Sequence, residues 1–175
     1  YLSEGIGRAA ARAYEKALAL DKPPAGRLRT IAQAFLAAGD PTRAEAFAQK
    51  HLQEAPEDAG ALLVLARCRK EKGDAAAARD AYSRALAANP LCGEALLALG
   101  DMALAEKRYA EAITHYRSAR RIQEFEEAAL RAEADALLKE GRLAEAIEVL
   151  EQIRAAHPDP NIDSLIREVR LRQER

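Results

Sequence analysis

The sequence is poor in the side chains that usually build large cores or catalytic sites. Its 175 residues include no tryptophan, one methionine, two cysteines, three histidines, five tyrosines and three phenylalanines. No apolar run approaches the roughly 18 residues that a membrane-spanning helix needs, so we expect no direct membrane insertion. With few large rings available, stability must come from helix propensity and from contacts between neighbouring elements.

The few cysteines and histidines form no recognisable site. Cys68 and Cys92 fall in different predicted helices, whose expected separation is beyond disulfide reach. Unpaired thiols favour a reducing, cytoplasmic compartment. His51, His115 and His157 share no metal-ligand spacing with one another or with a cysteine. No glycine-rich phosphate loop, nucleophile elbow or kinase signature is present. The sequence therefore predicts no enzyme, no metal and no cofactor.

Charge of one sign is also lacking. Lysine and arginine number 27 against 28 aspartates and glutamates. This balance gives no bulk field that would attract nucleic acid, so no nucleic-acid partner is expected. Residues 59–92 are mildly basic and residues 127–175 mildly acidic, as expected of solvated surface. The pairs Arg120-Arg121 and Glu126-Glu127 are interpreted in the same way, as solvated faces and helix-end charges.

A 34-residue period is the strongest feature that is present. Such periods mark repeat architectures, in which each unit buries its apolar face only against its neighbours. Small, large apolar, aromatic and turn-forming residues all recur in this one frame. The clearest series are Ala10, Ala44, Ala78, Ala112 and Ala146; Gly5, Gly39, Gly73 and Gly141, with Lys107 in the missing slot; Leu28, Leu62, Leu96 and Leu130; and Tyr14, Tyr82 and Tyr116.

Each period contains two predicted helices. Leu62, Leu65, Ala66 and Arg69 are spaced as one face of an α-helix, which Gly73 then ends. No alternating strand pattern and no hairpin turn is seen. The helix pairs are expected at 25–38 with 41–54, 93–106 with 109–122 and 127–140 with 143–156. The expected segments are a truncated repeat 1–24, full repeats 25–58, 59–92, 93–126 and 127–160, and a last helix in 161–175.

This pattern resembles the tetratricopeptide repeat. The motif is matched best by Leu96, Leu99, Gly100, Tyr109, Ala112, Tyr116 and Ala119, and in the preceding unit by Gly73, Ala78, Tyr82, Ala85 and Pro90. The resemblance covers residues 1–158 and implies an all-α, right-handed solenoid of about nine to ten antiparallel helices. Glu133 and Glu124 depart from it, at slots that are normally apolar and proline. Around them, helix 109–122 either runs on or meets the next repeat at an unusual angle.

The resemblance also implies a binding surface. In this family the first helix of each repeat lines a concave groove that holds an extended peptide or a partner helix. Leu63, Val64, Leu97 and Leu104 would form an apolar floor with basic residues around it, which suits a ligand with some acidic residues. The alternative is that these leucines pack against neighbouring first helices and leave little groove. The candidate groove residues are Arg29, Gln33, Leu36, Leu63, Val64, Arg67, Lys70, Glu94, Leu97, Asp101, Leu104, Arg131, Asp135 and Leu138.

Function is expected to be binding rather than catalysis. The clamp residues that some members use for chaperone tails are missing, so the partner is another protein or peptide of unknown identity. Tyr1 falls inside an expected helix, which suggests a fragment of a larger, bacterial protein. Helix 6–20 would then be an open end that could stack on a second copy, so self-association is one alternative, and a regulatory or spacer role is another. Helix 161–173 is expected to cap the last core, or else to begin a divergent repeat.

Overall fold

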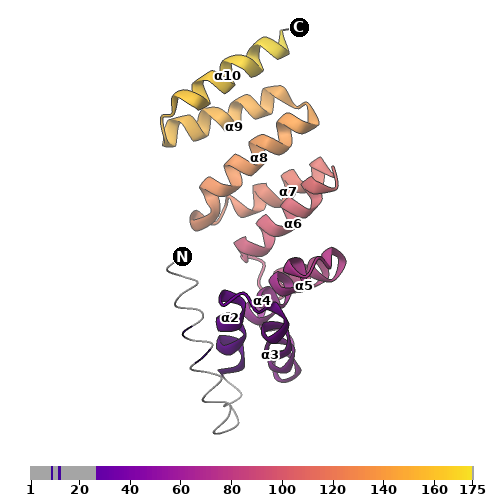
Figure 1. The fold of residues 1–175 in the computed structure, drawn as a ribbon. Coiled ribbons are helices and arrows are strands. Elements are labelled where there is room, and N and C mark those ends of the chain that lie inside the picture. The colour runs from indigo at the N-terminus through magenta and orange to yellow at the C-terminus, as the bar shows by residue number, and fades with distance from the viewer. Residues whose placement is uncertain (1–8, 10–11, 13–26, 175) are drawn as a thin grey trace. The chain divides into compact units, whose positions relative to one another are not determined.

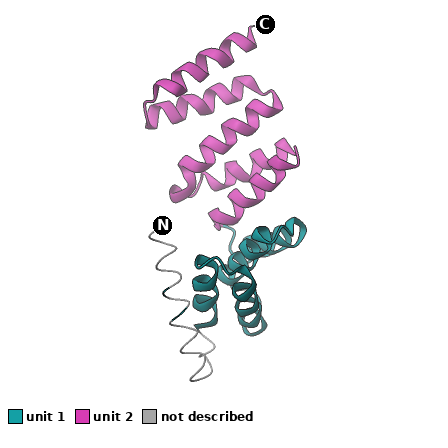
Figure 2. Cartoon of the chain, in the orientation of Figure 1, with its two compact units in different colours: residues 1–90 teal, residues 91–175 magenta. Residues whose placement is uncertain are grey.

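The computed structural model describes Ala9, Arg12 and residues 27–174. The chain divides into two compact units, residues 1–90 and 91–175 (Figure 2). Within each unit, consecutive helices run antiparallel (Figure 1), and no strand occurs among the described residues. The first unit contains α2 (Leu28–Ala37), α3 (Pro41–Glu54), α4 (Ala59–Glu71) and α5 (Ala75–Ala88). The second contains α6 (Gly93–Ala105), α7 (Tyr109–Ala119), the 3₁₀ helix η2 (Gln123–Phe125), α8 (Glu126–Glu140), α9 (Leu143–Ala156) and α10 (Pro160–Gln173).

The all-helical fold and its succession of helix pairs are confirmed in both units. The expected helices 41–54 and 143–156 match α3 and α9 to the residue, and the others agree within a few residues at their ends. The residues of the truncated first repeat, 1–24, lie outside the described part apart from Ala9 and Arg12. The proposed open-end helix 6–20 therefore stays a prediction.

Left-handed backbone ends the first helix of several repeats. Gly39, Gly73 and Gly141 have φ of 78°, 81° and 83°. Glycine takes this conformation without steric cost because it has no Cβ. Lys107, at the slot of the missing glycine, has φ of 61°. The repeat frame thus imposes the same turn on a residue that is poorly suited to it.

Aspartates start four of the helices. Asp40, Asp58, Asp74 and Asp159 each accept a hydrogen bond from a backbone amide in the first turn of the helix that follows, at 2.9–3.0 Å. A side-chain acceptor at this position satisfies an amide that has no partner within the helix. These caps fix where α3, α4, α5 and α10 begin.

The periodic alanines lie in the core. Ala44, Ala78, Ala112 and Ala146 are all completely buried. In the second unit the ring of Tyr116 lies against Gly100, where an added Cβ would be 2.4 Å from the Tyr116 Cε1 atom. The period therefore records close helix contacts in which small side chains leave room for a ring.

The junction between α7 and α8 differs from expectation. Helix 109–122 neither reaches residue 122 nor runs on, because α7 ends at Ala119 and η2 follows before α8. The ring of Phe125, at the end of η2, lies on Gly93 at the start of α6. This local 3₁₀ segment stands where the other repeats have a proline.

The last helix, α10, has one buried face. Ile166 and Val169 are 2% and 1% exposed, and both belong to the core of the second unit. Ser164, Arg167 and Glu168 are exposed. This is the burial pattern expected of a capping helix.

Candidate binding surface

In the first unit, α2 and α4 carry seven of the predicted groove residues. Leu36 and Val64 are only 6% and 3% exposed, so they belong to the core and cannot line an open surface. Leu63 is half-buried. The polar members Arg29, Gln33, Arg67 and Lys70 are all exposed. The predicted apolar floor of this unit is therefore reduced to Leu63, beneath three basic side chains.

One of those basic side chains, Arg29, is held by Asp58. Its Nη1 atom lies 3.2 Å from Asp58 Oδ1. The other Asp58 oxygen lies 2.9 Å from His51 Nε2, and the Ala61 amide donates to Asp58 at 3.0 Å. Asp58 thus connects α2, α3 and the start of α4. Burial alone would raise the pKa of Asp58, but hydrogen bonds from His51 and the Ala61 amide, together with Arg29, lower it below its ordinary 3.8.

This connection predicts acid-sensitive stability. A carboxyl whose pKa is lower in the folded than in the unfolded chain stabilises the fold fully above the ordinary value of 3.8 and loses this effect as the pH falls through its folded-state pKa. We expect Asp58→Asn, which can still cap α4, to cost about 1 kcal/mol at neutral pH. The cost should shrink in acid. The cost is measured by urea unfolding of the unchanged chain and of Asp58→Asn, at neutral pH and at the lowest pH at which both remain folded.

The matched control is Asp80→Asn. Asp80 is 62% exposed and lies 3.9 Å from Arg84 on the surface of α5. Such exposed pairs contribute little, so this change should be nearly neutral at either pH. An Asp58→Asn cost that is the same at neutral and acidic pH would contradict the role assigned to Asp58.

In the second unit, α6 and α8 carry the other seven predicted residues. Leu97, Leu104 and Leu138 are half-buried and pack with one side against the core. Each leucine contacts the core and also keeps exposed surface, and a groove along them stays a prediction. The polar members are Glu94 and Asp135, which are half-buried, and Asp101 and Arg131, which are exposed. Three acidic groups and one basic group therefore accompany these leucines.

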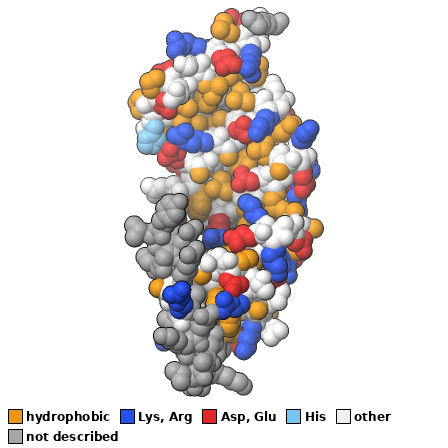
Figure 3. Space-filling view, viewed as in Figure 1, with side chains coloured by type: hydrophobic (Ala, Val, Ile, Leu, Met, Phe, Trp, Pro, Cys, Tyr) orange, Lys and Arg blue, Asp and Glu red, His pale blue; other side chains and the backbone are white. Residues whose placement is uncertain are grey.

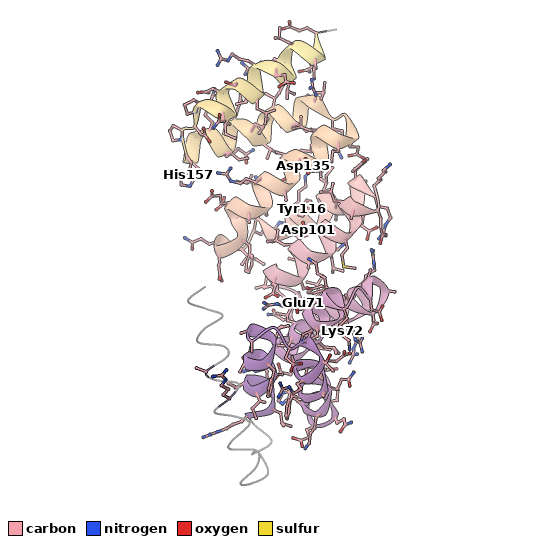
Figure 4. The ribbon with its side chains drawn as sticks, viewed as in Figure 1. Glu71, Lys72, Asp101, Tyr116, Asp135 and His157 are labelled. Carbon is pink, nitrogen blue, oxygen red and sulfur yellow. The ribbon has the colours of Figure 1, made fainter. Side chains whose placement is uncertain are left out.

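Tyr116 connects this surface to the core. Its hydroxyl donates to Asp101 at 2.8 Å, and Asp101 and Asp135 lie on either side of it in Figure 4. Burial, the hydrogen bond to Asp101 and the charges of both aspartates raise the pKa of Tyr116. The phenol therefore stays protonated and remains a donor. Asp135 also accepts a 2.7 Å bond from Lys139.

A buried ionic cluster was not predicted from the sequence. Glu133 is 1% exposed, with Arg117 Nε at 2.7 Å from one oxygen and Arg120 Nη1 at 2.9 Å from the other. Arg117 also bonds to Glu145 at 2.8 Å, and Arg120 to Gln152 at 2.6 Å. The cluster joins α7, α8 and α9. Arg120 does stand at the end of α7, as expected of a helix-end charge, but it pairs with the buried Glu133 and is not a solvated charge. The signal for this pairing was Glu133 at a normally apolar slot.

The histidines, cysteines and acidic side chains of the described residues form no metal-binding cluster. No group of three or more of these described side chains is arranged to hold a metal ion. Within the same residues, no helix has the length and apolar character to cross a membrane. Cys68 and Cys92 are buried and unpaired, and burial raises the pKa of the Cys68 thiol to about 12. On the visible face of residues 91–175, hydrophobic patches alternate with charges of both signs (Figure 3).

The geometry of short antiparallel helix pairs agrees with the comparison to known families. One family model described as "Tetratricopeptide repeat" matches residues 2–59 and again residues 63–127, and a second model with the same description matches residues 103–169. The chain belongs to the tetratricopeptide repeat family. Tetratricopeptide repeat domains are generally modules for protein–protein interaction, and scaffolds of this family are typically not enzymes. A comparison with curated proteins found no significant match.

Solved tetratricopeptide repeat structures share the fold. A crystal structure of the protein MamA is 23% identical with a TM-score of 0.73, over 89% of this chain and 88% of MamA. YrrB, described as having an unusual peptide-binding site, is 24% identical with a TM-score of 0.72, over 85% and 76%. PilF of Pseudomonas aeruginosa is 19% identical with a TM-score of 0.70, over 86% and 69%. At these identities the likeness concerns the fold alone.

Proposed function

We propose that this tetratricopeptide repeat chain is a non-enzymatic scaffold that binds a peptide or a partner helix on its first helices. The observation that carries the proposal is the half-burial of Leu97, Leu104 and Leu138. Each is fixed on its inner side by the core and exposes apolar surface on its outer side. Partly exposed apolar side chains beside polar groups suit the apolar face of an amphipathic segment.

Charge suggests what each unit accepts. In the first unit Arg29, Arg67 and Lys70 accompany Leu63, which favours acidic residues in the ligand. In the second unit three acidic residues and Arg131 accompany the leucines, which favours basic residues next to the apolar anchors. The proposed residues in the second unit are Glu94, Leu97, Asp101, Leu104, Arg131, Asp135 and Leu138; in the first they are Arg29, Gln33, Leu63, Arg67 and Lys70.

A Leu97→Glu substitution tests the proposal. We expect peptides selected from a random phage-displayed library against the full chain to lose most of their affinity, by about tenfold or more, because a charge replaces an anchor surface. Binding is measured by isothermal titration calorimetry. Leu171→Glu is the matched control, since Leu171 is 61% exposed on α10 and outside the proposed surface.

The thermal unfolding of both variants distinguishes lost binding from lost folding, because Leu97 also contacts the core. Selected peptides that bind Leu97→Glu and the unchanged chain equally well would contradict the site. Failure to select any peptide that competes at the first helices would contradict the function.

A further inference from the structure

A cavity of about 640 Å³ lies in the second unit, away from the leucines of the proposed surface. We call it the edge cavity, because it lies between the start of α8 and the end of α9. Figure 4 shows His157 at that end of α9. Its volume is within the range of small-ligand sites. The lining residues used below are Glu126, Glu127, Leu130, Ile153, Ala156 and His157.

The repeat frame shows that this cavity is a recurring feature. A cavity of about 410 Å³ in the first unit is lined by Leu62, Arg84, Ala87 and Ala88, among others. Each of these precedes a lining residue of the edge cavity by two 34-residue periods: Leu130, Gln152, Ala155 and Ala156. The edge between the two helices of a repeat is therefore hollow in both units, but the side chains around it differ.

In the intervening repeat an aromatic ring of the chain covers one of the corresponding positions. Gly93 is the residue one period before Glu127, and the Phe125 ring lies on it so closely that an added Cβ would be 2.1 Å from the ring. The residue one period after Phe125 is Asp159. Its side chain accepts from the Asn161 amide at 2.9 Å and caps α10. The residue at the position equivalent to Phe125 is therefore not aromatic, and the described residues that line the edge cavity include no phenylalanine or tyrosine.

The lining decides how an aromatic group would lie. Glu127 has a Cβ where Gly93 has none, so a ring cannot lie flat on the helix backbone there. The apolar part of the edge cavity is formed by the exposed Ala156 and by the outer atoms of Leu130 and Ile153, which are core residues only 6% and 2% exposed. A ring is therefore expected to rest mainly on Ala156 and to cover what remains exposed of Leu130 and Ile153.

The rim decides which residues should flank that ring. Glu126 and Glu127 are both exposed, and the lining contains no lysine or arginine. Glu127 already accepts hydrogen bonds from Arg131, the shorter at 3.0 Å, and lies 3.6 Å from His157. Glu126 should therefore contribute the larger share of the attraction for a cation.

We propose that the edge cavity binds a peptide segment in which an aromatic residue is flanked by arginine or lysine. The aromatic side chain lies against Ala156, Leu130 and Ile153 rather than on the helix backbone as Phe125 does at Gly93, and the basic side chains pair with Glu126 and Glu127. This site shares no lining residue with the proposed surface of the first helices, although Glu127 bonds to Arg131 of that surface, so it adds a second peptide contact to the proposed function.

A labelled peptide of sequence Gly-Arg-Phe-Arg-Gly tests the proposal on the full chain. We expect saturable binding by fluorescence anisotropy, and little or none with Gly-Glu-Phe-Glu-Gly or Gly-Arg-Ser-Arg-Gly. Glu126→Gln should weaken binding about threefold, as for an exposed ion pair, and more than Glu127→Gln. Ala156→Trp should remove saturable binding by filling the cavity. Glu148→Gln, an exposed change elsewhere on α9, is the matched control and should have no effect.

The location of the bound peptide is read independently of any variant. Amide chemical shifts should change at Leu130, Ile153 and Ala156, and not at Leu97 or Leu104. Equal binding of the arginine- and glutamate-flanked peptides would overturn the proposal, as would shift changes confined to the first-helix leucines. A dimer in sedimentation that Ala156→Trp abolishes would assign the cavity to a second copy of the chain and also overturn it. Because the probes differ, failure here leaves the Leu97→Glu test unaffected.

Discussion

Replacing Arg117 and Arg120 together by alanine should lower the free energy of unfolding by about 3–5 kcal/mol. The reason is that Glu133 is 1% exposed and both of its oxygens bond to these two arginines, at 2.7 and 2.9 Å. Without them a carboxylate is buried among apolar side chains with no cation to compensate it. Urea unfolding followed by circular dichroism measures the loss.

Replacing the acidic member of the cluster should lower the free energy of unfolding far less. Glu133→Leu removes the buried charge itself, and the arginines it leaves behind are 45% and 27% exposed, so they can turn toward water. We expect this variant to remain within about 1 kcal/mol of the unchanged chain, as for other buried ion pairs replaced by apolar residues. A control double change, Arg154→Ala with Arg172→Ala, removes two arginines whose partners Asp163 and Glu168 are 50% and 57% exposed. It should cost little.

The comparison of the three variants is decisive for the cluster. If Glu133→Leu costs as much as the Arg117 and Arg120 double change, the ion pairs stabilise the fold on their own account. If the double change at Arg117 and Arg120 costs no more than the Arg154 and Arg172 control, the buried carboxylate of Glu133 does not need its arginine partners for stability. Either result would contradict the asymmetry expected from burial.

The helix pairs could be predicted from the sequence because their signals are local. Glycine at the turn, alanine at the close contact and proline at the end each act within a few residues. Where the local signal was missing, prediction failed or stayed open. Lys107 makes the turn without glycine, and α7 ends three residues before the expected limit where Glu124 replaces proline.

The candidate surface was less predictable because burial depends on neighbouring helices. Leu36 and Val64 lie one step off the packing face in the repeat frame, yet both are buried. Their exposure depends on how closely the next helix packs, which the frame does not specify. Glu133 could be identified as unusual, but its partners Arg117 and Arg120 are 16 and 13 residues away on another helix. Only the packing of α7 on α8 brings them together.

The contact between Gly100 and Tyr116 gives the second large expected effect. Tyr116 is completely buried, so Tyr116→Ala should cost about 3–5 kcal/mol through the cavity that it leaves. Gly100→Ala in the unchanged chain should also destabilise, by about 1–2 kcal/mol, although alanine is the better helix former. The added Cβ would be 2.4 Å from Cε1 and 2.8 Å from Cδ1 of a ring with no room to move.

The double variant separates steric conflict from helix propensity. Once Tyr116 is alanine, the Cβ of Gly100→Ala meets no ring, so the same substitution should become stabilising by up to about 1 kcal/mol. Gly60→Ala in α4 is the matched control, because there the added Cβ would meet the flexible end of Arg29, at 2.9 Å from Nη1. The half-exposed Arg29 can move aside, at the cost of part of its pairing with Asp58, so the control should stay within about 1 kcal/mol of the unchanged chain. If Gly100→Ala costs the same with and without the Tyr116 ring, the contact between Gly100 and Tyr116 does not determine how closely α6 and α7 pack.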